Sequence, residues 1–335
     1  MRKVRLGRTG ISVNSNGFGA LPIQRISLED AGKLLRKAYD NGFDYFDTAR
    51  YYTDSEEKMG EALSDVRNRI VISTKTGAKT AVDFWKDLET SLRLLKTDYI
   101  DIYQFHNPGF VPMPGEENGL YDAMLKAKAQ GKIRHIGITN HGLERAVKAV
   151  ESGLYETLQF PFSYLSTDNE ISLAELCAKH DVGFIAMKAL SGGLITDSAT
   201  AAAFIAQYPN VEPIWGIQRE RELDEFISYN VHEPLMDDEK RQRIERDRKE
   251  LSGEFCRGCG YCMPCPAGIE ISNCARMSLL LRRAPLSVHL NDEWRAKMEK
   301  VKECRHCGKC KSKCPYGLDT PELLRRNYED FLTFL

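Results

Sequence analysis

Short apolar runs alternate with amphipathic stretches over roughly the first 230 residues, and this alternation restricts the fold more than any other feature. Eight apolar runs predict β-strands, and they are SNGFG, FDYFDT, IVISTK, YIDIYQF, HIGIT, TLQF, GFIAMK and EPIWGI. Helices are predicted between them, as in FWKDLETSLRLLK, whose apolar residues recur at spacings of three and four. Eight strands that are each followed by a helix predict an α/β fold, a closed (β/α)₈ barrel of the TIM type.

A doubly wound open sheet is the competing α/β fold. The number of predicted strands favours the barrel, and so does the lack of a GxGxxG motif after the first strand. Ahead of that strand, KVRLGRTGISVN predicts a β-hairpin that turns at RTG. We expect this hairpin to close the bottom of the barrel.

The composition changes at about Met236, so we place the barrel domain at 1–235. DDEKRQRIERDRKE predicts a charged helical connector within 236–255, and TPELLRRNYEDFLTFL predicts a capped terminal helix. Nine of the ten cysteines fall between Cys256 and Cys314, and the stretch between the two cysteine runs has a helical pattern. We expect 256–335 to form a small, mainly α-helical second domain.

Charge and hydrophobicity exclude several classes of protein. A net charge of −1 with 42% hydrophobic residues excludes a disordered chain and leaves no electrostatic footprint for nucleic acid. No apolar run approaches the roughly 18 residues of a membrane span, and the charged N-terminus lacks the apolar core of a signal peptide. We therefore expect a cytoplasmic protein, whose clustered cysteines serve as metal ligands in a reducing compartment.

Ionisable side chains stand at the ends of three consecutive predicted strands. The second strand ends in FDTARYY, which contains Asp47, Tyr51 and Tyr52; the third ends at Lys75 and the fourth at His106. Active sites of (β/α)₈ barrels lie at these strand ends. A free tyrosine, with a pKa of about 10, is too weak an acid to donate a proton well near neutrality. A neighbouring ammonium favours the phenolate and so lowers this pKa. Such a set is suited to protonating an oxygen whose carbon receives a hydride, which a nicotinamide commonly supplies.

These stretches resemble the aldo-keto reductase superfamily over roughly residues 1–230. The resemblance is carried by LGRTGISVNSNGFG, FDTARYYTDSEEKMG, VISTKTG, DYIDIYQFHNP, GKIRHIGITNH and FIAMKALSGG. It implies NAD(P)H-dependent carbonyl reduction, or the reverse alcohol oxidation, by a catalytic tetrad of Asp47, Tyr52, Lys75 and His106. Tyr52 is implied as the proton donor in preference to Tyr51, because it lies five residues after the aspartate.

The resemblance also implies where NADP or NAD binds. The residues implied for the carboxamide are Thr139, Asn140 and Gln159. Those implied for the rest of the cofactor, mostly in the loops after strands seven and eight, are Met187, Lys188, Ser191, Gly192, Gly216, Gln218, Arg219 and Arg221.

Several positions depart from the family pattern. Met187 replaces a tyrosine that often stacks on the nicotinamide, and Leu21 replaces a tryptophan on the substrate side. A basic cluster for the 2′-phosphate is reduced to Arg219 and Arg221, so the choice between NADP and NAD stays open. The family's large C-terminal substrate loop is absent from the sequence, and the substrate is not predicted.

The second cysteine run, CRHCGKCKSKCP, fits the C-x₂-C-x₂-C-x₃-C-P ligand run of bacterial ferredoxins, and CRGCGYCMPCP repeats it with one residue fewer. In such runs the fourth cysteine binds the other cluster. The pattern predicts two [4Fe–4S] clusters. Cluster one takes Cys256, Cys259, Cys262 and Cys314. Cluster two takes Cys265, Cys304, Cys307 and Cys310. The long helical spacer resembles the α-helical ferredoxin domains that accompany some dehydrogenases and reductases.

Zinc is the alternative, since C-x₂-C pairs also suit tetrahedral sites. Cys177 and Cys274 are surplus and receive no role, and His306 is expected to border a cluster without binding it. The leading hypothesis is a reductase with two attached clusters. These clusters either stabilise the C-terminal domain, exchange electrons with a redox partner protein or indicate a different barrel cofactor. The alternative is an electron-transfer iron–sulfur protein on a catalytically idle barrel. Each cluster passes one electron, whereas nicotinamide exchanges two together, and the sequence holds no flavin signature.

Overall fold

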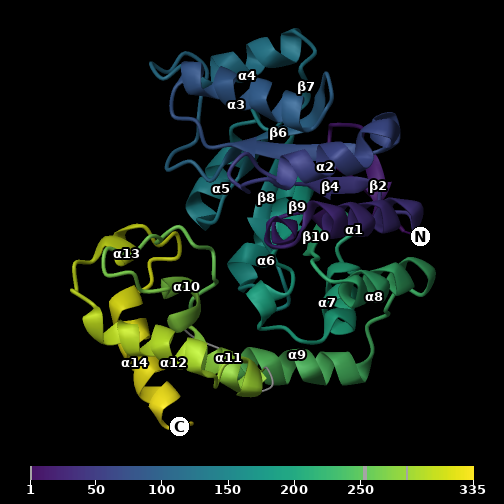
Figure 1. Ribbon diagram of the computed structural model, residues 1–335. Helices are drawn as coiled ribbons and strands as arrows, with labels where there is room; N and C mark the ends of the chain where they lie inside the picture. The colour runs from purple at the N-terminus through teal and green to yellow at the C-terminus, as the bar shows by residue number, and fades with distance from the viewer. Residues whose placement is uncertain (1, 252–254, 284–285) are drawn as a thin grey trace. The chain divides into compact units, whose positions relative to one another are not determined.

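A computed structural model describes residues 2–251, 255–283 and 286–335 (Figure 1). The chain forms two compact units. The barrel unit comprises Met1–Ala189 and Ala199–Met236, and the C-terminal unit comprises Leu190–Ser198 and Asp237–Leu335. Residues 252–254 of the predicted connector lie outside the described residues, as do residue 1 of the predicted barrel domain and residues 284–285 of the predicted helical domain.

Eight parallel strands close into a barrel in the order β10-β3-β4-β5-β6-β7-β8-β9. All eight predicted strands are present, so the barrel is confirmed and the open sheet is excluded. The strands are β3 (Gly17–Gly19), β4 (Tyr45–Asp47), β5 (Val71–Thr76), β6 (Ile100–His106), β7 (Ile133–Thr139), β8 (Thr157–Pro161), β9 (Gly183–Met187) and β10 (Val211–Gly216).

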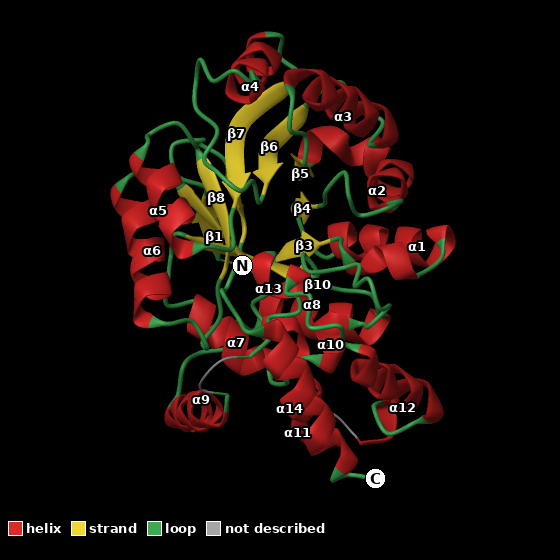
Figure 2. Ribbon diagram, turned by 90° about the vertical axis from the view of Figure 1, so that its left-hand side faces the viewer, coloured by secondary structure: helices red, strands yellow, loops and turns green. Residues whose placement is uncertain are grey.

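Helices lie outside these strands, as Figure 2 shows for α1 to α6. Helix α3 buries Phe84, Leu88 and Leu92, the face that the spacing predicted. The Thr80 hydroxyl accepts from the Asp83 N–H at its start, a cap that contributes about 1 kcal/mol. The barrel helices are α1 (Leu28–Asp40), α2 (Ser55–Leu63), α3 (Ala81–Leu94), α4 (Leu120–Ala129), α5 (Leu143–Glu151), α6 (Asp168–Lys179), α7 (Ser198–Ile205) and α8 (Glu220–Val231).

The predicted hairpin closes the N-terminal end of the barrel. Strands β1 (Lys3–Arg5) and β2 (Ser12–Asn14) pair antiparallel. Val4, Leu6 and Val13 are fully buried in one cluster with inward-facing barrel residues. Gly7 forms a bridge with Val182, immediately before β9. A Cβ on Gly7 would lie 2.4 Å from the Asp181 carbonyl oxygen, so the hairpin can approach this closely only at a glycine.

The C-terminal unit is mainly helical, as predicted. Helix α14 (Thr320–Leu332) begins at the Asp319 cap and packs on α11 (Met277–Arg283). The amide of Asn327 joins the two elements, because its oxygen accepts from the Ser278 N–H at 2.8 Å. The remaining helices are α9 (Asp238–Glu250), α10 (Ile271–Cys274), α12 (Asp292–Glu299) and α13 (Lys309–Ser312). Short 3₁₀ turns include η3 (Ser191–Gly193), η4 (Leu286–Val288) and η5 (Lys300–Glu303).

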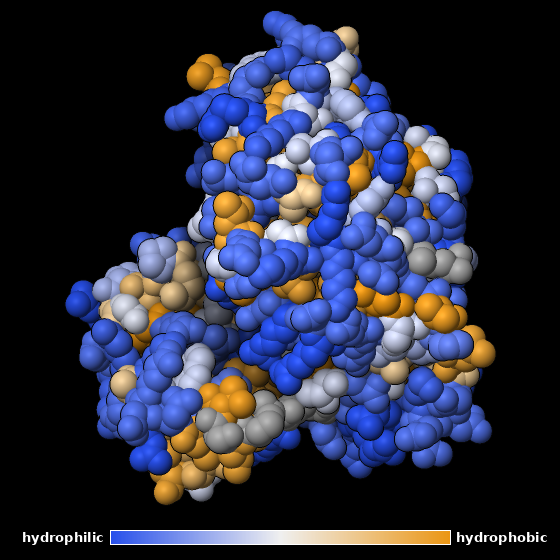
Figure 3. All heavy atoms as spheres, turned by 45° about the vertical axis from the view of Figure 1, so that its right-hand side comes forward, coloured by the Kyte–Doolittle hydropathy of each residue, from blue (hydrophilic) through white to orange (hydrophobic). Residues whose placement is uncertain are grey.

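The face in Figure 3 is largely hydrophilic, with scattered apolar side chains. Among the residues that the structure describes, no helix has both the length and the apolar character needed to cross a lipid bilayer.

Candidate active site and candidate cluster sites

Neighbouring strands bring the predicted tetrad together. Asp47 is the last residue of β4 and lies opposite Ser73 of β5. Two residues further along β5, Lys75 lies opposite Gln104 of β6. His106 is the last residue of β6. Parallel strands end at the same edge of a barrel, so these side chains converge at its C-terminal end.

Lys75 and Asp47 form a buried ion pair. The Lys75 Nζ lies 2.6 Å from the Asp47 Oδ1, and it also donates to the Thr48 carbonyl at 2.7 Å. The Lys75 and Asp47 side chains are 0% and 3% exposed. Burial lowers the pKa of Lys75, and the Asp47 carboxylate opposes this shift. The Ser73 hydroxyl donates a short hydrogen bond to the other Asp47 oxygen. Breaking such a pair on one side costs about 3–5 kcal/mol, so Lys75 is held firmly in place.

Two tyrosines flank His106 differently. The Tyr52 ring meets the His106 ring edge-on, with centroids 5.7 Å apart, and the Lys75 ammonium lies 5.5 Å from the Tyr52 centroid. Tyr51 stacks on His106 at 6.0 Å and is 63% exposed. Tyr52 is thus the tyrosine that lies next to the Lys75 charge.

We expect His106 to stay uncharged from pH 5 to 8, because burial and then Lys75 lower its pKa to about 3. An unfolded histidine takes up a proton below about pH 6.5, so this residue makes the fold lose stability as the pH falls from there toward 3. NMR of ¹³C-labelled histidine checks this, with a Lys75→Met variant in which the His106 pKa should rise. A His106 ring that titrates near its ordinary value in the unmodified protein would contradict the expectation.

Gln104 and Ser73 were missed from the sequence and lie at the centre of the polar network. The Gln104 amide donates to the Gln159 Oε1 at 2.8 Å, and its oxygen accepts from the Thr139 hydroxyl at 3.2 Å. Each residue precedes a predicted site residue by two positions, Gln104 before His106 and Ser73 before Lys75. Side chains two residues apart in a strand point to the same side of the sheet, so this spacing could have indicated that Gln104 and Ser73 face the site.

The three residues implied for the nicotinamide carboxamide differ in what they contact. Thr139 and Gln159 both bond to Gln104 inside the barrel. Asn140 follows β7 directly and is 0% exposed, yet neither polar atom of its side chain has a hydrogen-bond partner among the described residues. An unpartnered buried amide is costly, and a carboxamide offers the complementary donor and acceptor. This site therefore fits a nicotinamide.

The other implied cofactor residues of the barrel unit follow the last two strands. Met187 ends β9 and is 8% exposed, packed in the apolar cluster of the barrel interior. Lys188 follows it with a left-handed φ of 57°. Gly216 ends β10. These three residues lie at strand ends, as the resemblance implies.

Helix α8 begins in GIQRERELDEF, where the 2′-phosphate residues were predicted. The backbone N–H groups of Gln218 and Arg219 both donate to the Glu222 carboxylate at 3.0 Å. The Arg219 guanidinium lies 3.8 Å from the same carboxylate, and Arg221 is exposed. The Glu222 carboxylate thus accepts hydrogen bonds from the N–H groups of the two residues just before this helix.

Ser191 and Gly192 belong to the C-terminal unit, which the sequence did not indicate. Arg276 holds their turn, because its Nη1 donates to the Gly192 carbonyl at 2.8 Å. A Cβ on Gly258 would lie 2.7 Å from the same Nη1, so the guanidinium also packs on the first cysteine run. Arg276 therefore joins the Ser191–Gly193 turn to the loop between Cys256 and Cys259.

The eight cysteines of the two runs line two cavities in the C-terminal unit. The first cavity is lined by Cys256, Cys259, Cys262 and Cys314. The second is lined by Cys262, Cys265, Cys304, Cys307 and Cys310. The structure thus brings the last cysteine of each run to the cavity of the other run, as the ferredoxin pattern has it. Cys262 borders both cavities.

The donor set suits clusters better than single ions. Among the described residues, no group of three or more histidine, cysteine, aspartate or glutamate side chains is arranged to hold one metal ion. Zinc needs its ligand atoms about 2.0–2.3 Å from one centre, whereas cysteines around a cavity can each reach a different iron. Burial raises the pKa of Cys262 to about 12. Several buried thiols in one place therefore need a strongly positive group to stabilise their thiolates.

The surplus residues are not among those that line the cavities. Cys177 on α6 is fully buried, and the fully buried Cys274 thiol donates to the Lys297 carbonyl at 3.8 Å. His306 is exposed. None of the three lines either cavity.

A closed barrel with polar side chains gathered at its strand ends defines a protein of the (β/α)₈-barrel class. Residues 15–207 match the Aldo/keto reductase family, and the chain belongs to this family. Residues 255–319 match the 4Fe-4S dicluster domain.

Three known proteins show the extent of the similarity. L-galactose dehydrogenase of Arabidopsis thaliana is 30% identical over 211 residues, which cover 57% of this chain and 66% of that enzyme. An aldo-keto reductase from Klebsiella pneumoniae, solved with NADPH, is 24% identical with a TM-score of 0.63, covering 73% of this chain and 94% of that one. A Bacillus halodurans aldo-keto reductase in its holo form is 21% identical with a TM-score of 0.66, covering 76% and 98%. The chain spans slightly less than two thirds of the length of two curated relatives that it matches, 66% of L-galactose dehydrogenase and 65% of an aldo-keto reductase of Bacillus subtilis.

Proposed function

We propose that the barrel reduces the carbonyl group of a small molecule with NADPH or NADH, or oxidises the corresponding alcohol. The observation that carries this proposal is the buried Lys75–Asp47 pair beside Tyr52. A buried ion pair is weak evidence for stability, since an apolar pair of the same size commonly stabilises a fold as well. Its position next to a tyrosine at the strand ends is better explained by proton transfer.

In this proposal Tyr52 gives its phenolic proton to the carbonyl oxygen of the substrate. The Lys75 ammonium stabilises the negative charge that develops on the phenol oxygen as the proton leaves. Asp47 holds Lys75 in place, and the neutral His106 orients the carbonyl oxygen. When bound, the nicotinamide supplies the hydride to the carbonyl carbon. In the reverse direction Tyr52 removes the alcohol proton.

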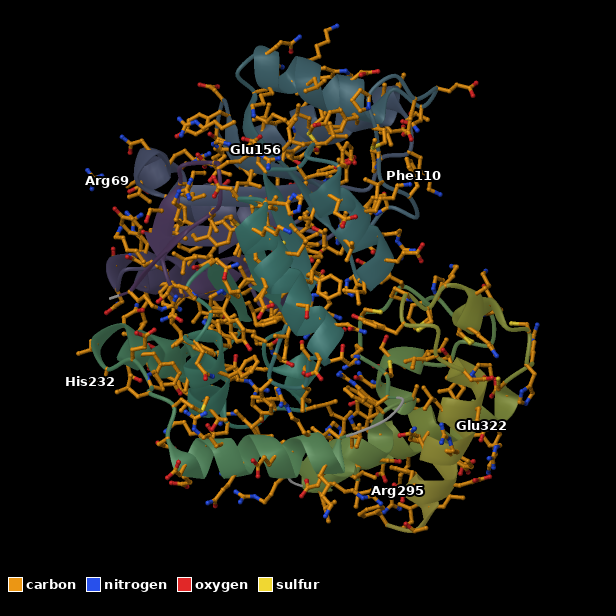
Figure 4. All side chains as sticks on the ribbon, turned by 180° about the vertical axis from the view of Figure 1, so that it is seen from behind. Arg69, Phe110, Glu156, His232, Arg295 and Glu322 are labelled. Atoms are coloured by element: carbon orange, nitrogen blue, oxygen red, sulfur yellow. The ribbon has the colours of Figure 1, made fainter. Side chains whose placement is uncertain are left out.

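The loops around this site favour a substrate with an apolar portion. Three large side chains are exposed in loops after barrel strands: Leu21 after β3, Tyr51 after β4 and Phe110 after β6, at 39%, 63% and 42% exposure. Phe110 is labelled on its loop in Figure 4. Loops after the strands carry substrate contacts in this fold. Their apolar surface supports an aromatic or aliphatic carbonyl compound as the substrate class.

Asn140 is proposed to bind the carboxamide, which gives a direct test. We expect Asn140→Leu to weaken NADPH or NADH binding by about tenfold or more, since a bound amide would lose both hydrogen bonds. The melting temperature should stay the same or rise, because two buried polar atoms without partners are removed. Fluorescence titration of the holoprotein with each nucleotide measures the first quantity and calorimetry measures the second.

Two variants complete that experiment. Thr139→Val serves as the matched control, because Thr139 already bonds to Gln104 and should affect nucleotide binding less. The double variant Arg219→Ala with Arg221→Ala should weaken NADPH more than NADH if these arginines contact a 2′-phosphate. Failure of the unmodified protein to bind either nucleotide would overturn the proposed reductase activity.

We further propose that the eight cysteines hold two [4Fe–4S] clusters, with the ligand sets predicted from the crossed pattern. The two cysteine-lined cavities support this assignment. Each cluster stores one electron, so the pair together matches the two electrons of one hydride in number. The clusters would pass these electrons to or from a redox partner.

A further inference from the structure

The two cysteine-lined cavities differ in how far they open to solvent. Around the first cavity, Cys256 and Cys262 are buried and Cys259 is half-buried. Around the second, Cys307 is exposed, and no other cysteine among the described residues is. A ligand sulfur at the surface shortens the path of an electron from outside. The second cavity is therefore the one through which a cluster could exchange electrons with another molecule.

Positively charged residues lie close to Cys307 in the sequence, and two of them, Arg305 and Lys309, line the second cavity with it. Arg305, Lys309 and Lys313 are all exposed, and within the described part of the chain none of them has an ion-pair partner. Their neighbour Lys311 is paired with Asp319 at 2.8 Å. We call Arg305, Lys309 and Lys313 the basic face. The first cysteine run carries no lysine and a single arginine, so this charge is confined to the second run.

Some other cations of the C-terminal unit pair with nearby carboxylates. Arg325 on α14 lies 2.7 Å from Glu322, which is labelled in Figure 4, and 2.5 Å from Glu329. Lys302 pairs with Glu299 at 2.5 Å. The chain as a whole has a net charge of −1, so the basic face is a local feature and does not follow from a generally basic protein.

We propose that the basic face is the docking site of a small acidic electron-transfer protein that exchanges electrons with cluster two. The proposal rests on the two clusters proposed above. In each encounter one electron passes between the partner's redox centre and cluster two, so that one is reduced as the other is oxidised, and no bond forms or breaks. Complementary charge raises association rates by about 10–10³-fold at low salt, which suits brief redox encounters. A nucleic acid would also be attracted to positive charge, but it gains nothing from an exposed ligand cysteine.

The test measures how fast reduced holoprotein is reoxidised in a stopped-flow instrument. The probes are cobalt(III)–EDTA, which is an anion, hexaamminecobalt(III), which is a cation, and a plant-type [2Fe–2S] ferredoxin, which is an acidic protein. The triple variant Arg305→Gln, Lys309→Gln, Lys313→Gln should slow oxidation by the anion and the ferredoxin by about tenfold at low ionic strength, and should speed oxidation by the cation. High salt should abolish these differences.

A matched triple variant on α9, with Arg241, Arg246 and Lys249 each changed to glutamine, removes the same charge from a helix that carries no cluster cysteine. It should leave all three rates within about twofold of the unmodified protein. Equal effects of the two triple variants on the rates would overturn the proposal. It would also be overturned if the unmodified protein bound a DNA oligonucleotide, and the basic-face variant lost that binding but kept the same electron-transfer rates. Iron and sulfide are measured in each variant. A protein without clusters refutes the proposed function, whereas intact clusters with unaffected rates refute the docking face alone.

Discussion

Replacing Tyr52 with phenylalanine is expected to lower kcat for carbonyl reduction by about 10³-fold, within the range of roughly 10²–10⁴ that a general acid contributes. The variant removes one oxygen and leaves the ring beside Lys75 and His106. The reason for the large effect is that no other acid of the described site lies in the same relation to the Lys75 charge. Nucleotide binding should be unchanged, since Asn140 and not Tyr52 is proposed to hold the carboxamide.

Tyr51→Phe is the matched control. Tyr51 also lies against His106, but it stacks on the outer side and is mostly exposed. Loss of the Tyr51 hydroxyl should change KM for the substrate more than kcat. Steady-state kinetics of both variants, with nucleotide affinity measured by fluorescence, separate the two tyrosines. Unchanged turnover in Tyr52→Phe would remove the proposed proton donor.

The second large effect is expected at the clusters. The unmodified protein, purified without oxygen, should contain about eight iron and about eight acid-labile sulfide per chain. Cys310 is buried and lines the second cavity. Cys310→Ala should reduce both counts to about four, because one proposed cluster loses a ligand. It should also lower the melting temperature of the C-terminal unit, because a group that binds only the folded chain stabilises it. Chemical analysis, electron paramagnetic resonance and calorimetry measure these quantities.

Cys274→Ala is the control for that experiment. Cys274 is also fully buried, so the change removes a similar buried volume and differs mainly in that its sulfur lines neither cavity. The iron count should stay at about eight. Stoichiometric zinc with no iron in the unmodified protein would contradict the cluster assignment.

The intact polar network argues against an idle barrel. An electron carrier that used the barrel only as a scaffold would have no need of a buried lysine, which costs free energy to desolvate. Lys75 and Asp47 are both buried here, and the unpartnered Asn140 amide lies in the same unit. The two clusters proposed above would each pass one electron, whereas a nicotinamide exchanges two as a hydride, so the pair matches one hydride in number of electrons.

Most of the fold followed from the pattern of apolar residues. Strand periods, helix faces and the RTG turn are local properties, and each predicted strand appears at the expected place. The meeting of Asp47, Lys75 and His106 could be anticipated as well, because these residues stand at strand ends, which the fold brings to one edge wherever eight strands close. Gln104 and Ser73 could have been found from their two-residue spacing to His106 and Lys75.

The sequence alone therefore determined the barrel, the residues that meet at its strand ends and the two cysteine runs, because these depend on short-range spacing. Only the tertiary structure decided which atoms have partners. It shows that the Asn140 side chain has no hydrogen-bond partner among the described residues, whereas Thr139 and Gln159 bond to Gln104. It places Leu190–Ser198 in the C-terminal unit. The exposure of Cys307 was likewise decided by the fold. Burial and pairing depend on residues far apart in the chain, and no local pattern encodes them.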